Sequence, residues 1–337
     1  MATIRDVAKT AGVSVATVSR IINNKGEASP ETIARVQQVI QKLHYRPNSI
    51  AKSLSKRRSN LIALLIPTLK NPFFPELVRE IEASANQKGY HIFLCNTDDD
   101  RNKVKYYLDS ILSHYACAAI INSLYVESKD LEMLESHGIL TLTIDRAQFN
   151  HPYSAISVDH KTGASKAVSH LLDQGCRKII HLSGPKDQMS SIDRLSGYQE
   201  ALNAFNPDLP QKVIYANFDL FSGYQSIQSL IQSSFLFDGI FCSNDALALG
   251  AMRACLEAGF KIPDQVKIVG YDNILFSRYV TPSLSTISQH MKEMGTLAIT
   301  EIISLMQQPN AKPRKIRIQP NLVIRESSTQ LRRNHHE

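Results

Sequence analysis

Residues 3–23 read TIRDVAKTAGVSVATVSRIIN, and this stretch decides the fold of the first part of the chain. Thr3 followed by Asp6 is typical of a helix start, because the hydroxyl and the carboxylate satisfy free amides at the positive end of the helix dipole. Gly12 ends this first helix, and Ser14 is the N-cap candidate of a second.

A third helix is expected from Ser29, where Pro30 takes the first helical position. Apolar side chains then recur at helical spacing as far as Leu43. Two short helices around a glycine-containing turn, braced by a third helix, form a helix-turn-helix domain. We therefore expect an all-α helix-turn-helix head over residues 1–47.

Charge is distributed unevenly along the chain. Residues 1–60 carry 11 Lys and Arg against three acidic residues, whereas the remainder carries 27 basic and 28 acidic residues. A basic segment joined to a neutral body indicates a polyanion-binding head. Charge alone leaves open a solvated basic face that has no partner.

Other classes of protein are disfavoured. No apolar run approaches the roughly 20 residues that span a bilayer, and no apolar stretch follows the first charges, so we expect a cytoplasmic protein without membrane contact. With its basic head, the protein is expected to be nucleoid-associated. The five cysteines lack C-x-x-C spacing and the 11 histidines are scattered, which predicts neither disulfides nor a metal site. Motifs for a nucleophile or a cofactor loop are missing, so we expect neither an enzyme nor a cofactor.

The string from Ile4 to Asn23 closely resembles the DNA-binding head of the lactose/galactose repressor (LacI/GalR) family, and residues 43–48 resemble the family's exit from the third helix. The resemblance implies a transcriptional repressor whose second helix enters the major groove. Arg20 would donate to a guanine, while Val15 and Ala16 offer apolar contact to a thymine methyl. Simple helix propensity is the alternative explanation of Val15 and Ala16.

The same resemblance implies a wider set of DNA contacts, many of them to phosphates. The expected residues are Thr3, Ser14, Val15, Ala16, Thr17, Ser19, Arg20, Asn23, Tyr45, Asn48, Ala51, Lys52, Leu54 and Arg57.

Residues 48–60 are expected to form a hinge helix and linker. A helix here is too short to be stable alone in water, and in the resembling family it orders on operator DNA in a dimer. Leu54 matches an apolar wedge in the minor groove, with Lys52 and Arg57 near phosphate or groove floor. A charged linker with an exposed Leu54 is the alternative.

From Leu61 onward, apolar runs alternate with amphipathic stretches. The runs predict strands over residues 61–69, 91–96, 118–122, 140–145, 156–159, 178–183, 213–216, 239–243, 267–271 and 284–288. Helices are expected over residues 76–88, 103–113, 161–174, 194–205 and 246–258. Runs that are apolar throughout indicate parallel strands buried on both faces. So many repeats exceed one compact sheet, and we expect two doubly wound α/β subdomains that bind ligand beyond the strands' carboxyl ends.

Polar residues gather where these strands end. Asp145-Arg146, Asp272-Asn273 and Gln289 each follow a predicted strand. Carboxylates and amides pair with the vicinal hydroxyls of a sugar, and an Arg donates to its oxygens. The positions lack a glycine-rich phosphate loop, so a small neutral polyol is favoured over a phosphate.

Residues 61–330 resemble the periplasmic sugar-binding protein fold that this family shares, and in particular its ribose-binding branch. The implied effector is D-ribose. The residues that match the branch's pocket are Asn71, Phe73, Phe74, Asp145, Arg146, Arg194, Phe218, Asn244, Asp272 and Gln289. Several of these residues, including Arg194, Asn244 and Asp272, are generic to the family. The residues that do most to indicate the sugar are Asn71, Phe73, Phe74, Phe218 and Gln289.

Structural roles are the alternatives for several of these residues. Asp145-Arg146 fits a surface ion pair, the two Phe residues after Pro72 fit a core, and Asp272 fits a helix cap. Asn122 also ends a strand, but nothing independent places it in the pocket.

The resemblance also implies domain boundaries within the core of residues 61–330. The N-subdomain is expected to comprise residues 61–158 and 290–318, and the C-subdomain residues 159–289 and 319–330, before a polar tail at 331–337. Symmetry predicts a homodimer on a pseudo-palindromic operator. The dozen polar residues from Glu326 to Glu337 leave no room for a tetramerisation heptad, so we expect a dimer in preference to a tetramer.

Two functions remain in view. The first is a repressor controlled by a small neutral sugar. The second is a catabolite-control regulator of the same family that uses a phosphorylated carrier protein as corepressor, a role that needs no complete sugar pocket.

Overall fold

The computed structural model describes residues 2–22, 28–45, 59–145, 151–308 and 311–329. The chain forms two compact units, Met1–Ser59 and Asn60–Glu337. None of the helices in these described ranges has the length and apolarity to cross a membrane.

The first unit contains three helices, α1 (Ile4–Ala11), α2 (Val15–Ile22) and α3 (Pro30–Lys42). Their inward faces form one small core, made by Val7, Ala8, Ala11, Val18, Val36 and Val39. This arrangement confirms the helix-turn-helix head. The expected hinge helix falls almost entirely on residues 46–58, outside the described residues.

Capping fixes where these helices begin and end. The Thr3 hydroxyl accepts the Asp6 amide at 3.3 Å, while the Asp6 carboxylate accepts the Thr3 amide at 2.8 Å. The Thr3 amide and the Thr3 hydroxyl both donate to the Asp6 carboxylate and favour its charged form, so the pKa of Asp6 is lowered. Gly12 follows α1 with φ 66°, a left-handed conformation that glycine adopts without strain. The turn between α1 and α2 is therefore set locally.

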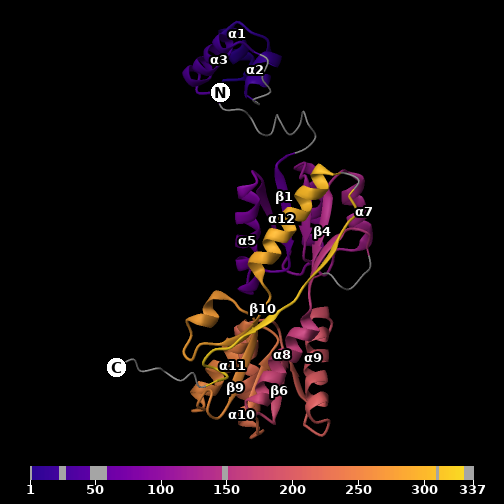
Figure 1. Cartoon of the computed structure of the whole chain (residues 1–337), viewed down its shortest axis with the longest axis vertical. Helices are drawn as coiled ribbons and strands as arrows, with labels where there is room; N and C mark the ends of the chain where they lie inside the picture. Colours follow the sequence, from indigo (N-terminus) through magenta and orange to yellow (C-terminus); the bar gives the residue numbers. More distant parts are fainter. Residues whose placement is uncertain (1, 23–27, 46–58, 146–150, 309–310, 330–337) are drawn as a thin grey trace, which may run out of the picture. The chain divides into compact units, whose positions relative to one another are not determined.

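The second unit contains two six-stranded sheets (Figure 1). The first sheet is entirely parallel, in the order β11 (Lys315–Ile318), β5 (Ser154–Val158), β4 (Leu140–Ile144), β3 (Ala118–Ile121), β1 (Leu61–Ile66) and β2 (His91–Asn96). The second has the order β12 (Asn321–Val323), β10 (Ser285–Ser288), β9 (Lys267–Asp272), β8 (Gly239–Cys242), β6 (Ile179–Ser183) and β7 (Lys212–Tyr215). Only β12 in this sheet is antiparallel to its neighbour.

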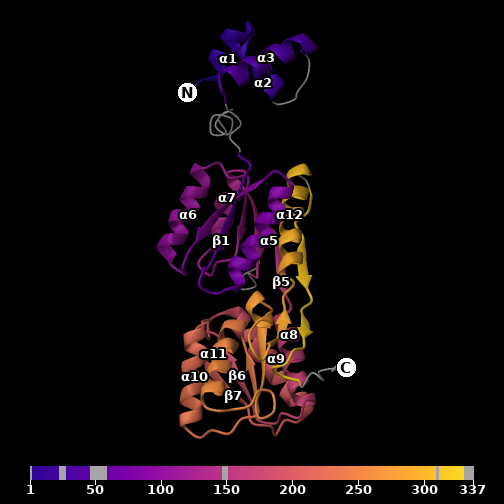
Figure 2. The same ribbon diagram turned by 90° about the vertical axis from the view of Figure 1, so that its left-hand side faces the viewer.

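Helices cover both faces of each sheet, as the two views show (Figure 2). The first sheet has α5 (Phe73–Gln87) and α12 (Met291–Gln307) on one face and α6 (Arg101–Ser113) and α7 (Ser128–Ser136) on the other. The second has α8 (His160–Asp173) and α9 (Met189–Phe205) on one face and α10 (Leu220–Gln232) and α11 (Asp245–Glu257) on the other. This doubly wound pair of subdomains confirms the expected fold class.

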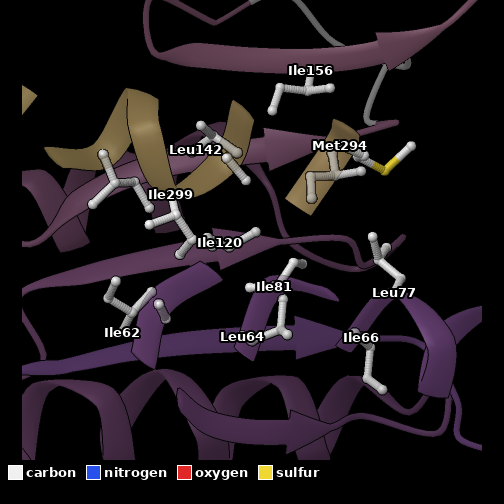
Figure 3. Close-up of a cluster of buried hydrophobic side chains, with 14 of the residues drawn as sticks. Ile62, Leu64, Ile66, Leu77, Ile81, Ile120, Leu142, Ile156, Met294 and Ile299 are labelled. Carbon is white, nitrogen blue, oxygen red and sulfur yellow. The ribbon is translucent and has the colours of Figure 1, made fainter. Parts of the chain in front are cut away.

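Strand β1 shows why the sequence is apolar throughout each strand. Ile62, Leu64 and Ile66 face α5 and α12 (Figure 3), whereas Ala63 and Leu65 belong to the cluster under α6 and α7. Because successive side chains point to opposite faces of a sheet, a strand covered on both sides needs apolar residues at every position.

The chain passes between the two subdomains three times. It crosses between β5 and α8, between β10 and α12, and between β11 and β12. Each sheet is therefore completed at its edge by a strand from the last part of the chain.

Several boundaries differ from the sequence prediction. The first strand was expected to reach Leu69 but ends at Ile66, because Pro67 lacks the amide that would continue the ladder. The helix expected from Arg194 begins earlier, at Met189. Helices α7, α10 and α12 were not among the expected elements.

Candidate functional site

A cavity of about 320 Å³ lies at the carboxyl ends of the strands and is lined by residues of both subdomains. We call it the cleft. Nine of the ten predicted effector residues line it, namely Asn71, Phe73, Phe74, Asp145, Arg194, Phe218, Asn244, Asp272 and Gln289. The tenth, Arg146, lies outside the described residues.

Two aromatic rings form the apolar part of the N-subdomain wall. The Asn71 side-chain oxygen accepts the Phe73 amide at 3.1 Å, which fixes the start of α5 beside the cleft. Phe73 and Phe74 meet edge to face, with 5.2 Å between ring centroids. Phe73 also belongs to the buried core, so the core role and the cleft role both apply to it.

Asp145 presents a charged group from the end of β4. Its Oδ1 accepts the Val158 amide at 2.9 Å and lies 3.5 Å from Nε2 of His160. Burial acts to raise the pKa of Asp145, but His160, the Val158 amide and Arg194 outweigh it, so the pKa is lowered. Asp145 therefore faces the cleft as a carboxylate.

Arg194 is almost completely buried, with 5% of its surface exposed. Its guanidinium donates to the Ser243 carbonyl at 2.6 Å and to Nδ1 of His160 at 3.2 Å, and lies 4.0 Å from the Tyr271 ring centroid. The Arg194 Nε has no hydrogen-bond partner among the described residues. A buried donor left unpaired is costly, so Nε is a candidate donor to a ligand.

Asp272 and Gln289 make the C-subdomain floor of the cleft. The Gln289 amide donates to Asp272 Oδ1 at 2.5 Å, while the Gln289 oxygen has no partner in the described part of the chain. Burial raises the pKa of Asp272 well above its usual range, although Arg194 acts against this. The alternative of Asp272 as a helix cap is wrong, because the next helix, η1 (Leu275–Arg278), has Ile274 as its N-cap.

Asn244 and Phe218 are held by the backbone around them. The Asn244 oxygen accepts the Leu247 amide at 2.8 Å and so caps α11, while its NH₂ lies 3.4 Å from the Phe218 carbonyl. A Cβ at Gly184 would lie 2.2 Å from the Phe218 ring. Glycine at position 184 therefore makes room for the aromatic side chain.

The cleft also contains residues that were not predicted, among them Asn122, Ser123, His160 and Ser190. Asn122 ends a strand, and this signal was available in the sequence. His160 and Ser190 lie in the first turns of helices, where the sequence carries no signal that separates them from other helical residues. No group of His, Cys, Asp and Glu within the described ranges is placed to hold a metal ion.

The second helix of the head presents the predicted base-reading side chains to solvent. Val15 is 41% exposed, and Ala16 and Arg20 are also exposed, whereas Val18 is buried. The Ser14 hydroxyl accepts the Thr17 amide at 3.0 Å and opens the helix.

The other predicted DNA-contacting residues differ in exposure. Thr3 is exposed and Ser19 half-buried, while Tyr45 packs against the head core. Six lie outside the described residues, namely Asn23, Asn48, Ala51, Lys52, Leu54 and Arg57.

Each of the two units of the chain matches a known protein family. Residues 3–48 match the family described as bacterial regulatory proteins, lacI family, and residues 168–328 match the periplasmic binding protein-like domain. The chain is 37% identical to the ribose operon repressor of Halalkalibacterium halodurans, covering 97% of each protein. It is 32% identical to the HTH-type transcriptional repressor PurR of Histophilus somni, covering 97% of this chain and 99% of the relative.

Solved structures show the same likeness. A lac repressor dimer bound to operator and the anti-inducer ONPF aligns with a TM-score of 0.86 at 26% identity, covering 97% of this chain and 99% of the other. A LacI family transcriptional regulator from Enterococcus faecium with bound ribose aligns with a TM-score of 0.73 at 28% identity, covering 80% of this chain and 99% of the other.

A helix-turn-helix head joined to a two-subdomain binding core defines a DNA-binding regulator with its own ligand-sensing domain. The chain belongs to the LacI family of bacterial transcriptional regulators. Within that family it is a repressor and not an enzyme, like the ribose operon and PurR repressors to which it is similar.

Proposed function

We propose that the protein is an operator-binding repressor whose DNA affinity is controlled by D-ribose bound in the cleft. The observation that carries the proposal is the convergence of nine ribose-branch residues, drawn from both subdomains, on one cavity. The similarity to ribose operon repressors and to a ribose-bound regulator supports the same sugar.

The chemistry of the cleft favours a small neutral polyol. Its volume of about 320 Å³ lies at the low end of the roughly 300–1,000 Å³ typical of ligand pockets. The unpaired Arg194 Nε and Gln289 oxygen offer one donor and one acceptor, and Asp145 and Asp272 add carboxyl oxygens. Oxygen acceptors of this kind suit the vicinal hydroxyls of a sugar, whereas the Asp145 carboxylate disfavours a phosphate.

Control of DNA binding requires that ribose distinguish two states of the protein. Ligand that contacts both walls of the cleft stabilises a closed arrangement of the subdomains. Ribose releases the operator if the closed state binds DNA less well than the open one, since a ligand shifts an equilibrium only by its differential affinity.

Residues 1–47 would read the operator. Arg20 would donate to a guanine while Val15 and Ala16 contact methyl groups in the major groove. The hinge of residues 48–60 would place Leu54 in the minor groove as a wedge. Residues 61–330 would then serve as the effector-binding and dimerisation core.

A homodimer fits an exposed apolar surface of the C-subdomain. We call it the dimer face, and it comprises Leu220, Phe221, Leu275, Phe276 and Tyr279, of which Phe221 is 71% and Tyr279 is 75% exposed. A Cβ at Gly250 of α11 would lie 2.1 Å from the Leu220 carbonyl oxygen, and the Ser277 hydroxyl donates to Asp245 at 2.6 Å. The start of α10 and helix η1 thus both lie beside α11, and exposed apolar side chains on such neighbouring elements indicate a protein interface.

Calorimetry on the full chain tests the effector. We expect D-ribose to give saturable heat and to weaken operator binding, while other pentoses, hexoses and purine bases do neither. Asp272→Ala should lose the response to ribose and keep operator affinity in the absence of sugar. Ribose without heat and without effect on operator binding would overturn the proposal, and a requirement for a phosphorylated carrier protein would favour the catabolite-control alternative.

A further inference from the structure

We propose that His160 is a positioning residue of the effector site, which holds Arg194 and Asp145 at a fixed spacing across the two subdomains. This inference rests on the proposed sugar-binding function of the cleft. His160 is 5% exposed, lines the cavity, and is the first residue of α8, directly after the chain has crossed from the first sheet.

The imidazole is surrounded by groups from three other elements. Its Nδ1 lies 3.2 Å from an Arg194 nitrogen of α9 and 3.1 Å from the Tyr271 hydroxyl of β9. Its Nε2 lies 3.5 Å from Asp145 Oδ1 at the end of β4. One ring therefore contacts the cation and the carboxylate that the proposed function assigns to sugar binding.

These contacts define the tautomer. A guanidinium carries only N–H donors, so Nδ1 of His160 must accept the hydrogen bond from Arg194. The proton of the neutral ring then lies on Nε2, which points at Asp145 Oδ1 at a distance of 3.5 Å. In this form the ring accepts from the cation and offers its N–H to the carboxylate or to a sugar hydroxyl beside it.

The fixed ring keeps the guanidinium in one orientation. Arg194 donates on one side to the Ser243 carbonyl at 2.6 Å and on the other to His160. With both ends held, its unpaired Nε is directed by the protein and not by the ligand. Without His160 only the Ser243 carbonyl and the Tyr271 ring would hold the guanidinium, and the freedom that it gains would be lost again when the sugar binds, which weakens affinity.

Three substitutions in the full chain distinguish the contributions of the two ring nitrogens to ribose binding. His160→Ala removes both and should weaken ribose binding about tenfold or more, the loss typical of a hydrogen bond to a charged group. His160→Asn restores an acceptor near the Nδ1 position and should recover part of that loss. His160→Gln restores a polar group only at the far position and should recover less than Asn.

A histidine on the same helix provides the matched control. His170 of α8 is also buried, hydrogen bonds to Ser328 at 2.8 Å, and does not line the cleft. His170→Asn should leave ribose affinity within twofold of wild type, and thermal unfolding of every variant checks that affinity does not simply follow stability.

The outcomes distinguish this inference from the proposed function. If wild type binds ribose and His160→Ala binds it with the same affinity, the role of His160 is overturned and the proposed function stands. The same holds if His160→Asn and His160→Ala lose equal ribose affinity, because the acceptor at the Nδ1 position then makes no difference. If ribose gives no heat but another sugar binds, the proposed effector fails, and the same variants test His160 on that sugar. No binding of any sugar by wild type would overturn both.

Discussion

Asp245 carries a buried carboxyl group directly after the cleft residue Asn244. Its oxygens accept the Thr286 hydroxyl at 2.6 Å, the Ser277 hydroxyl at 2.6 Å and the Ile274 amide at 2.9 Å. Burial nevertheless raises the pKa of Asp245 to about 6. The group that ties η1 to α11 therefore changes charge close to neutral pH.

We expect Asp245→Asn to alter how stability depends on pH. Because the pKa of Asp245 is raised in the folded protein, the folded state holds the proton more tightly, and stability is lost as pH rises from about 4 to about 6. The shift corresponds to roughly 3 kcal/mol. Urea unfolding at pH 4 and pH 6.5 should show wild type losing stability relative to the variant, and a constant difference between the two proteins would contradict the shift.

Most of the cleft could be predicted from the sequence. Residue types that suit a sugar follow the predicted strands, and the carboxyl ends of parallel strands meet at one edge of the sheet. The prediction failed where chemistry depends on neighbours. Nothing in the sequence shows that His160 meets Asp145 and Arg194, since these contacts join residues from three separate elements. Nor does it show that the Asn244 oxygen is already engaged in capping α11.

Among the elements, α2 depends on a single cap for its first turn. We expect Ser14→Ala to lower the stability of the head by about 1 kcal/mol, because the Thr17 amide loses its acceptor. Operator affinity should fall with it, since Val15 and Ala16 directly follow the cap.

Ser29→Ala is the matched control for this cap. Ser29 opens α3 by accepting the Thr32 amide at 3.3 Å, but α3 presents no predicted base contact. Thermal unfolding should show similar losses in the two variants, while operator titration should show the larger effect for Ser14→Ala. Equal operator affinities in the two variants would contradict a DNA-facing α2.

Elements with strong local signals were predictable, and those without them were not. Buried strands such as β1 and β8 stood out as uninterrupted apolar runs. The ends of elements depended on tertiary packing, so α9 begins five residues before its predicted start. The edge strands β11 and β12 are short and partly polar, and tertiary pairing defines them.

At the scale of the whole molecule, the dimer face should control assembly. We expect Phe276→Asp to shift the protein from dimer to monomer in analytical ultracentrifugation, because a charge would be buried in an apolar interface. Operator affinity should fall sharply, since a pseudo-palindrome is read by two heads.

An exposed aromatic on another helix controls for the added charge. Tyr106 of α6 is 67% exposed and lies on the opposite layer of the first sheet from α5 and α12. Tyr106→Asp should leave the dimer intact. A dimeric Phe276→Asp would place the interface elsewhere.

The three crossings between subdomains have a consequence for how the protein is made. The head is built from one continuous stretch and can fold as soon as α3 has been synthesised. The first sheet of the core lacks its edge strand β11 and the cover of α12 until residue 318 has left the ribosome. Its other strands end at residue 158, so a nascent chain carries an unfinished sheet through most of translation. Chaperone contact during synthesis should therefore concentrate on this sheet, whose apolar face stays open the longest.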